Sequence, residues 1–303
     1  MKNHVFLIQA HRYPELLRRI LKRLESSNHF FYINIDSKAK NQDEFKSAIS
    51  EISGIRQVTH RNIIHGGFSQ IDCTVSQLRD SYQDELNFAY FHSISGQDYP
   101  CVSNGEFDSV FENGDKSYML CDTESEALER RVGPYIERLE HWYFMDVFNG
   151  PIARKLHVPG ILKLLLWPIH RPLKFMDRIY GGWNWFSLSR KSINYLLDYL
   201  QSHKDYLDRF KYTFCTDEIV YSTVLRPVRE QLNIETRNSL RFVEWYPKRP
   251  AKQLPLTLEA SEYQDIVHSN ALFCRKVAIP ESLELMNLSL IHISEPTRHS
   301  LIS

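Results

Sequence analysis

The sequence predicts an α/β fold in which helices cover both faces of a mainly parallel central sheet. Over residues 1–100, short apolar and aromatic runs alternate with stretches whose apolar residues recur at helical spacing. Two of the runs, 30–36 and 89–94, lead into polar residues. Alternation of this kind is typical of parallel strands joined by helices.

Each expected element has a local signal. Strands are expected at 5–10, 30–36, 56–60, 89–94 and 240–246, and helices after Pro14 and over 43–52. The first of these helices carries Leu16, Leu17, Ile20, Leu21 and Leu24 on one face. Two later helices show the same spacing, at Ile71, Val75, Leu78 and Tyr82 and at Ile193, Leu196, Leu197 and Leu200.

We expect one domain over residues 1–280, since the composition is that of an ordinary globular protein, with 43% hydrophobic and 24% charged residues. Residues 288–303 resemble the translation of a sequencing-library adapter. We therefore expect this tail to be non-native and the natural C-terminus to be missing.

Charge and cysteine usage exclude some classes. Basic and acidic residues balance at 37 each, so no overall positive field favours nucleic acid as a partner. The five cysteines form no CxxC pair, which argues against a zinc site or a disulfide framework. The apolar run near the start is too short for a signal peptide, and no run spans a bilayer, so we expect a cytoplasmic protein.

Residues 152–174 form a segment of different character. It contains Arg154, Lys155, Lys163, Arg171 and Lys174, an apolar stretch over 161–167, and no acidic residue. It could touch the inner face of a membrane. The alternative is a helix whose Leu162, Leu165 and Leu166 pack on the core while its lysines face water.

Candidate ligand-binding residues lie where predicted strands end. Asp36 follows one strand, and Gln97 and Asp98 follow another, at the edge where open α/β sheets bind ligands. Five cations occur later in the chain, and they are either a solvated surface or a set that neutralises a diphosphate: Lys248, Arg249, Lys252, Arg275 and Lys276.

Residues 216–218, Thr-Asp-Glu, open a predicted helix. They could simply be a threonine cap with acidic residues that offset the helix dipole. Alternatively, the positive potential of the helix start holds Glu218 ionised, ready to accept a proton from a sugar hydroxyl.

Signs of a metal site are few in the sequence. There is no Asp-x-Asp pair, of the kind that binds magnesium or manganese, and the closest approximations are 34–36 and 122–124. The 13 histidines include no HExxH, and His60 with His65 is interpreted as loop composition. Four aromatic residues could stack on sugar rings or belong to the core: Trp183, Trp185, Trp245 and Tyr246.

These motifs together resemble the core-2/I-branching β-1,6-N-acetylglucosaminyltransferases and peptide O-xylosyltransferases, over about residues 4–277. Residues 95–100, Ser-Gly-Gln-Asp-Tyr-Pro, match the family's Ser/Cys-Gly-x-Asp-Tyr/Phe-Pro turn, and 33–38 resemble its Ile-His-Val-Asp-x-Lys strand end. Residues 182–190, the Asp217-Glu218 pair, the strand that ends in Trp245 and residues 271–276 follow in the family's order. Trp183 and Val277 depart from its serine and phenylalanine.

The resemblance implies a GT-A-type inverting glycosyltransferase that uses a UDP-sugar, with N-acetylglucosamine or xylose as the transferred sugar. By it, Glu218 is the general base, Lys276 binds the donor diphosphate with the help of Arg275 or a cation near Lys252, and Asp122, Trp245 and Tyr246 meet the acceptor. With the residues placed by strand ends and ring faces, the predicted donor site is Asp36, Gln97, Asp98, Lys252, Arg275 and Lys276. The predicted acceptor site, for a glycan or lipid-linked saccharide, is Asp122, Trp183, Trp185, Asp217, Trp245 and Tyr246. Cations are expected to replace a metal, with a divalent cation left open.

Two other classes remain. A non-catalytic sugar-binding protein on the same fold would keep the aromatic residues without needing Glu218 or the cations. A nucleotidyltransferase generally has a glycine-rich phosphate-binding loop after its first strand. Residues 9–14, Gln-Ala-His-Arg-Tyr-Pro, do not form such a loop.

Overall fold

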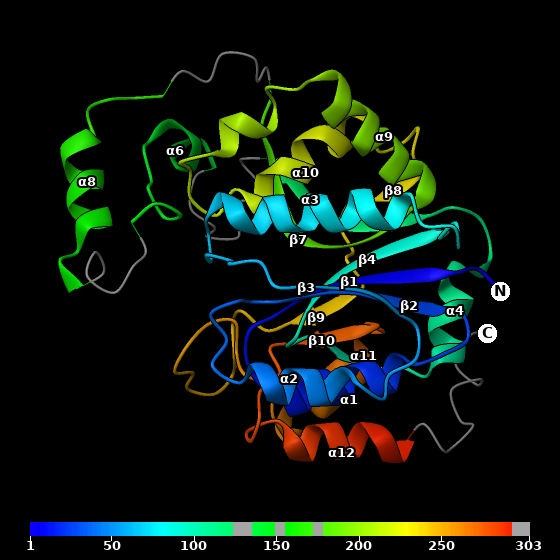
Figure 1. Cartoon of the computed structure of the whole chain (residues 1–303). Coiled ribbons are helices and arrows are strands. Elements are labelled where there is room, and N and C mark those ends of the chain that lie inside the picture. Colours follow the sequence, from blue (N-terminus) through cyan, green and yellow to red (C-terminus); the bar gives the residue numbers. More distant parts are fainter. Residues whose placement is uncertain (124–134, 149–154, 172–177, 293–303) are drawn as a thin grey trace.

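The computed structural model describes residues 1–123, 135–148, 155–171 and 178–292, and its centre is a seven-stranded sheet (Figure 1). In spatial order the strands are β3 (Ile55–Thr59), β2 (His29–Ile35), β1 (His4–Ala10), β4 (Tyr90–Ser95), β7 (Tyr180–Ser189), β6 (Ser117–Thr123) and β8 (Ile234–Glu235). Within this sheet only β7 runs antiparallel to its neighbours. The predicted mainly parallel sheet is confirmed.

Both faces of the sheet are buried, because the side chains of β1 alternate between two cores. Phe6 and Ile8 belong to one core, and Val5 and Leu7 to the other. Helices that contribute to the first core are α1 (Pro14–Leu24), α2 (Gln42–Ile49), α4 (Asn104–Glu112), α11 (Tyr263–His268) and α12 (Leu283–His292). The second core takes α3 (Phe68–Tyr82), α6 (Tyr135–Glu140), α9 (Arg190–Ser202) and α10 (Asp217–Leu225). Figure 1 shows these two layers above and below the sheet.

A second, three-stranded sheet brings distant parts of the chain together. It consists of β5 (Tyr99–Pro100), β10 (Phe273–Arg275) and β9 (Arg241–Val243). Cys274 pairs with Tyr99 in antiparallel register and with Phe242 in parallel register. As a result, the end of β10 lies beside the turn that follows β4.

The close packing of β7 on its neighbours depends on two glycines. A Cβ added at Gly182 would lie 1.9 Å from the carbonyl oxygen of Leu120 on β6, and one at Gly181 would overlap the ring of Tyr135. Neither position can hold a larger residue without moving the strand. These contacts fix the course of β7 where its side chains approach the site.

Most predicted elements are confirmed, with shifted ends. The apolar faces predicted for α1, α3 and α9 are buried, except that Tyr82 and Leu197 are only partly covered. The helix expected over 43–52 is α2, and the strand expected over 240–246 is shorter, because β9 ends at Val243. Helix α12 runs into the tail expected to be non-native, and residues 293–303 lie outside the described part.

Helix α8 (Val158–Leu166) covers part of the segment 152–174. The alternative had Leu162, Leu165 and Leu166 packed on the core. It is wrong for Leu165, of which 67% is exposed, whereas Leu162 and Leu166 are half-buried. Residues 152–154 and 172–174 lie outside the described part of the chain. Among the described helices, none is both long enough and apolar enough to cross a bilayer.

Candidate active site

The parallel strands β1, β2 and β4 deliver polar residues to one edge of the sheet. Asp36 follows β2, and its backbone N–H donates to the carbonyl of Ala10 at the end of β1. The Asp36 carboxylate is buried, accepts a hydrogen bond from the backbone of Lys38 at 2.9 Å and pairs with the Lys38 ammonium at 3.6 Å. Its charge is therefore partly balanced within its own loop.

The turn after β4 clamps the end of β10. The Arg275 guanidinium donates to both carboxylate oxygens of the fully buried Asp98, at 2.8 and 3.0 Å, and to the Ser95 hydroxyl at 3.2 Å. It also lies 3.6 Å from the centre of the Trp185 ring. Gln97 exchanges backbone and side-chain hydrogen bonds with Val277.

These contacts refine the predicted donor site. Arg275 is neutralised by Asp98, and Gln97 and Asp98 bond within the protein, so the three position the segment that carries Lys276. Between the described residues, no hydrogen bond or ion pair engages the Lys276 ammonium. Burial, followed by the charges of Arg275 and Arg12, lowers the pKa of Lys276.

Arg12, His11, Asp36 and Lys276 form a charged cluster at this edge, which we call the donor-edge cluster. Desolvation lowers the pKa of His11, Arg12 and Lys276 lower it further, and Asp36 opposes them. These mutual effects place the four groups within electrostatic reach of one another. Sequence reasoning missed Arg12 and His11, although their position directly after β1 was the available signal.

The predicted cations of residues 248–252 have different environments. Arg249 makes a bidentate pair with Glu262 at 3.0 Å for both bonds, and also contacts Glu259. Lys248 is largely exposed and lies 3.4 Å from Asp265. Lys252 is exposed, and in the part of the chain that the structure describes it has no ion-pair partner. Lys252 and Lys276 are therefore the two predicted cations that are open to a ligand.

The acidic pair at the start of α10 has two different surroundings. The Glu218 carboxylate is 30% exposed, and its Oε2 accepts from the Arg138 guanidinium of α6 at 2.6 Å. Its Oε1 has no hydrogen-bond partner among the described residues. The threonine cap is wrong in detail, since the Thr216 hydroxyl does not cap the helix and bonds to Thr213 instead. Arg138 was missed, because no motif links it to a residue 80 positions away.

Asp217 is buried beside Glu218 and is held by two amides. Its Oδ2 accepts from Asn184 at 2.7 Å and from Gln70 at 2.9 Å. Burial, followed by the neighbouring charge of Glu218, raises the pKa of Asp217 to about 7. An aspartate in this setting is partly protonated at neutral pH.

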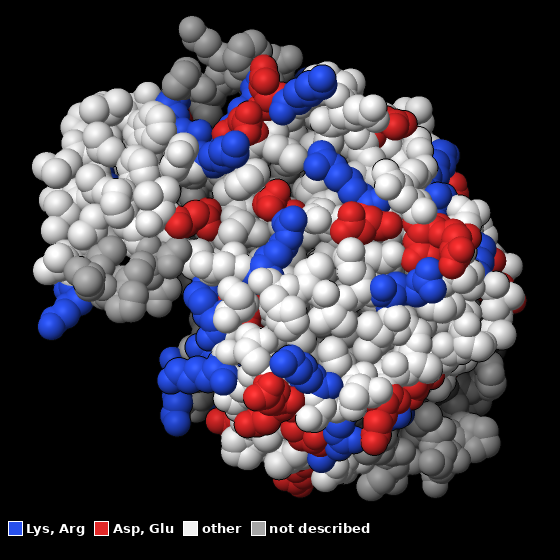
Figure 2. Space-filling model, in the orientation of Figure 1, with Lys and Arg blue, Asp and Glu red and all other residues white. Residues whose placement is uncertain are grey.

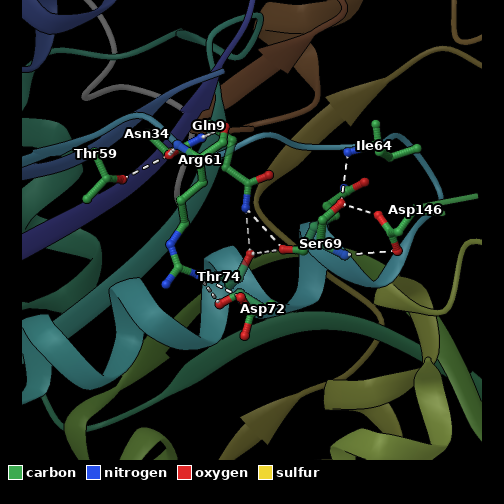
Figure 3. A network of polar contacts seen from close by, with 10 residues as sticks. Gln9, Asn34, Thr59, Arg61, Ile64, Ser69, Asp72, Thr74 and Asp146 are labelled. Atoms are coloured by element: carbon green, nitrogen blue, oxygen red, sulfur yellow. Dashed lines mark hydrogen bonds and ion pairs between the residues drawn. The ribbon is translucent and has the colours of Figure 1, made fainter. Parts of the chain in front are cut away.

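A polar network ties this pair to the carboxyl edge of the sheet through Gln70, and Figure 3 shows its part around Gln9, Ser69 and Thr74. The Gln9 amide, at the end of β1, donates to the Gln70 carbonyl and to Thr74, both on α3. Asp146 caps the first turn of α3, accepting from the backbone of Phe68 at 2.6 Å and from the Ser69 hydroxyl at 2.6 Å. Through Gln70, the start of α3 is thus fixed between the donor-edge cluster and Asp217.

The same network holds the loop that connects β3 to α3. As Figure 3 shows, Asn34 accepts from Thr59 and from the backbone of Arg61, and Arg61 pairs with Asp72 at 2.7 Å. His60 and His65 lie in this loop. The interpretation that they do not form a metal site stays a prediction.

The predicted aromatic platforms are dispersed. Trp183 meets Trp185 edge-on at 5.8 Å, and Arg275 already covers one face of Trp185. Trp245 and Tyr246 follow β9 and are 37% and 65% exposed. The backbone of Asp122 pairs with Gly181, but its side chain lies outside the described residues. The acceptor roles of all these residues stay predictions.

A histidine cluster lies at the opposite, amino end of the sheet. His4, His29 and Asp108 present ligand atoms within 4.8 Å of one another, and His29 bonds to Asp108 at 2.8 Å. Burial lowers the pKa of His4 to about 3, and His92 bonds to His4 at 3.0 Å. Although three such residues could hold a metal, their position excludes contact with a ligand at the donor-edge cluster. Sequence spacing did not reveal them, because they converge from three elements.

Comparison with known proteins places the chain in a known family. The profile of the Core-2/I-Branching enzymes matches residues 5–267. The chain belongs to this family. It is 24% identical over 254 residues to a human beta-1,3-galactosyl-O-glycosyl-glycoprotein beta-1,6-N-acetylglucosaminyltransferase, covering 79% of this chain and 54% of the relative. The predicted family resemblance is confirmed.

Two further relatives of the Core-2/I-Branching chain have other transferred sugars in their names. The beta-glucuronosyltransferase GlcAT14B of Arabidopsis thaliana is 23% identical over 282 residues, covering 86% of this chain and 59% of the relative. Human xylosyltransferase 1 is 22% identical over 262 residues, covering 82% of this chain and 24% of the relative. The chain spans little more than half of the first two relatives and a quarter of the third. It is thus related to enzymes that transfer a sugar, and their names differ in which sugar.

Proposed function

We propose that this protein is an inverting glycosyltransferase of the GT-A type that moves a sugar from a UDP-sugar to an acceptor hydroxyl. N-acetylglucosamine and xylose are the proposed sugars, and a surface polysaccharide or other glycan is the proposed product. The observation that carries the proposal is the state of Glu218: Arg138 binds and orients one carboxylate oxygen, while the other has no partner among the described residues.

In the proposed reaction, Oε1 of Glu218 accepts the proton of the acceptor hydroxyl as that oxygen attacks the anomeric carbon. The bond from this carbon to the diphosphate oxygen breaks, the electron pair leaves with UDP, and the configuration inverts. Attack from the side opposite the leaving group requires that base and diphosphate site lie on opposite sides of the sugar. The hydrogen bonds from Gln9 through Gln70 to Asp217 join α10 to the end of β1, which holds the proposed base near this edge of the sheet.

The leaving diphosphate needs positive charge as it departs. Lys276, Lys252 and Arg12 are the proposed source, because Arg275 and Arg249 are paired with carboxylates. Lysine binds phosphate as a point charge, and a half-buried ammonium has less competing hydration. We propose that these cations act in place of a metal.

The test is release of UDP from a panel of UDP-sugars: UDP-N-acetylglucosamine, UDP-xylose and UDP-glucuronic acid. The full chain would be compared with Glu218→Gln and with Glu230→Gln, a matched control at a highly exposed glutamate. Each would be assayed with and without EDTA. Turnover of one donor in EDTA, reduced about 10²–10⁴-fold only in Glu218→Gln, would support the proposal.

Other outcomes would reject parts of it. If EDTA alone abolishes turnover, metal independence is wrong, while Glu218 keeps its role if its variant is inactive in added metal. If no donor is turned over, yet a sugar binds with equal affinity to the protein and to Glu218→Gln, the chain is a sugar-binding protein. Membrane contact and a cytoplasmic location stay predictions.

A further inference from the structure

Residues 155–171, which we call the α8 lobe, carry an apolar stripe that faces solvent. Ile161, Leu164 and Leu165 recur at helical spacing on α8 and are 51%, 77% and 67% exposed. Leu156, Trp167 and Ile169 add exposed apolar surface on either side. The face of the lobe visible in Figure 2 is almost free of charged side chains. A stripe at this spacing normally faces a protein core, and an exposed one marks a docking surface.

The orientation of α8 is the reverse of that expected for a solvated surface helix. Lys163 points toward the protein, with its ammonium 5.0 Å from the ring centres of both Tyr143 and Trp167. Trp167 in turn stacks on His141 at 3.6 Å. The lobe is therefore fixed on the side of Lys163 and Trp167, where Leu162 and Leu166 are half-buried, and Leu164 and Leu165 are left outward.

The charge of the lobe indicates which partner fits it. It contains no carboxylate, and of its three cations Lys155 is exposed, whereas Lys163 and Arg171 are half-buried against the protein. An exposed apolar stripe with an exposed cation and no negative charge fits the headgroup region of an anionic bilayer. A docking site for a protein would instead be expected to combine an apolar centre with a rim of polar side chains.

The lobe also lies beside the proposed base. Arg171 donates to the carbonyls of Leu139 and Arg209, which ties the lobe to α6. Helix α6 carries Arg138, the partner of Glu218, and the Arg138 carbonyl accepts from Phe214, close before α10. Figure 1 shows α8 and α6 on the same side of the molecule. A membrane at the lobe would thus lie next to the acceptor side of the site.

We propose that the α8 lobe docks on a bilayer with anionic headgroups and presents the site to a saccharide carried by a lipid in that bilayer. The docking stands on the exposed stripe and its charge alone, whereas the lipid-carried acceptor rests on the proposed function. If Glu218 lies next to the docking surface, a hydroxyl carried by a membrane lipid can meet this base while its lipid stays in the bilayer.

The test is flotation of the full chain with phosphatidylcholine vesicles that contain or lack phosphatidylglycerol. The chain would be compared with the double variant Leu164→Gln/Leu165→Gln and with Val110→Gln, a matched control at an exposed apolar residue of α4. We expect flotation with the phosphatidylglycerol vesicles, lowered at least about tenfold in the double variant and unchanged in the control. High salt should weaken it, because the cations contribute.

UDP release by the same three proteins, in the absence of vesicles, separates the two proposals. Unchanged release in the double variant shows that the fold and the site are intact. Flotation without UDP release would reject the proposed function and leave the docking surface standing. UDP release without flotation, or equal flotation of the double variant, would overturn the docking surface alone. A dimer in light scattering that the double variant loses would also overturn it, since a second copy would then cover the stripe.

Discussion

The raised pKa of Asp217 predicts an unusual dependence of stability on pH, which Asp217→Asn should remove. The folded carboxyl has a pKa of about 7 against an ordinary value of 3.8. Between these values the folded state binds more protons than the unfolded state, so the free energy of unfolding falls as pH rises. Each unit of the shift corresponds to roughly 1.4 kcal/mol.

From about pH 5 to about pH 8, the cost of ionising Asp217 in the folded state grows by roughly 2.5 kcal/mol. The asparagine of the variant would keep an oxygen to accept from Asn184 and Gln70, but has no charge to repel Glu218. Other titrating groups are common to both proteins. Hence the stability of the variant relative to the parent should rise by about 2.5 kcal/mol over this range.

The assay is urea unfolding of both proteins at the two pH values, followed by tryptophan fluorescence. The difference in free energy of unfolding between variant and parent is taken at each pH, and the two differences are then subtracted. The pH-independent cost of the substitution cancels in this double difference. Parallel pH dependence, with a double difference below about 0.5 kcal/mol, would show that Asp217 titrates normally and that burial beside Glu218 does not hold its proton.

Three further predictions concern the other charged groups. Arg275→Lys should lower the free energy of unfolding by about 2 kcal/mol in urea titrations, because lysine has no planar group to stack on Trp185 while its nitrogen bonds Asp98; unchanged stability would contradict this. Lys276→Ala should lower kcat/KM for the UDP-sugar by about 10–100-fold while unfolding is unchanged, since the ammonium has no described protein partner to lose; a loss of stability instead would make it a structural cation. Asp108→Asn should cost about 2 kcal/mol of stability, because His29 then loses a charged partner, and should leave UDP release by the folded protein unchanged; loss of activity without loss of stability would connect the histidine cluster to catalysis.

The main sheet could be predicted because its strands and helices carry strong local signals. Runs such as 5–8 and 30–33 are apolar or aromatic throughout, as parallel strands buried on both faces require. Of the small sheet only β9 was expected as a strand. The sheet itself could not be predicted, because β5 and β10 are two and three residues long and the three strands pair across most of the chain. Strand β7 was also missed as a strand, since glycines and tryptophans at its start hide the alternation.

Those candidate site residues that belong to short sequence motifs could be predicted. Glu218 and Lys276 were found through motifs, and the structure gives each an open polar atom. Their supporting residues were not predictable, because Arg138, Asn184 and Gln70 reach the acidic pair from three separate elements. None of the three has a sequence context that distinguishes it from an ordinary surface residue.

These supporting residues give the adjacent carboxylates of Asp217 and Glu218 different environments. Only one guanidinium among the described residues bonds to the pair, and it bonds to Glu218. Burial raises the pKa of Asp217, while its Oδ2 accepts from two amides. Oε1 of Glu218 has no hydrogen-bond partner among the described residues, which is the geometry that the proposed general base requires. On the proposed function, Asp217→Asn should keep the hydrogen bonds from Asn184 and Gln70 and leave Glu218 in place as the base.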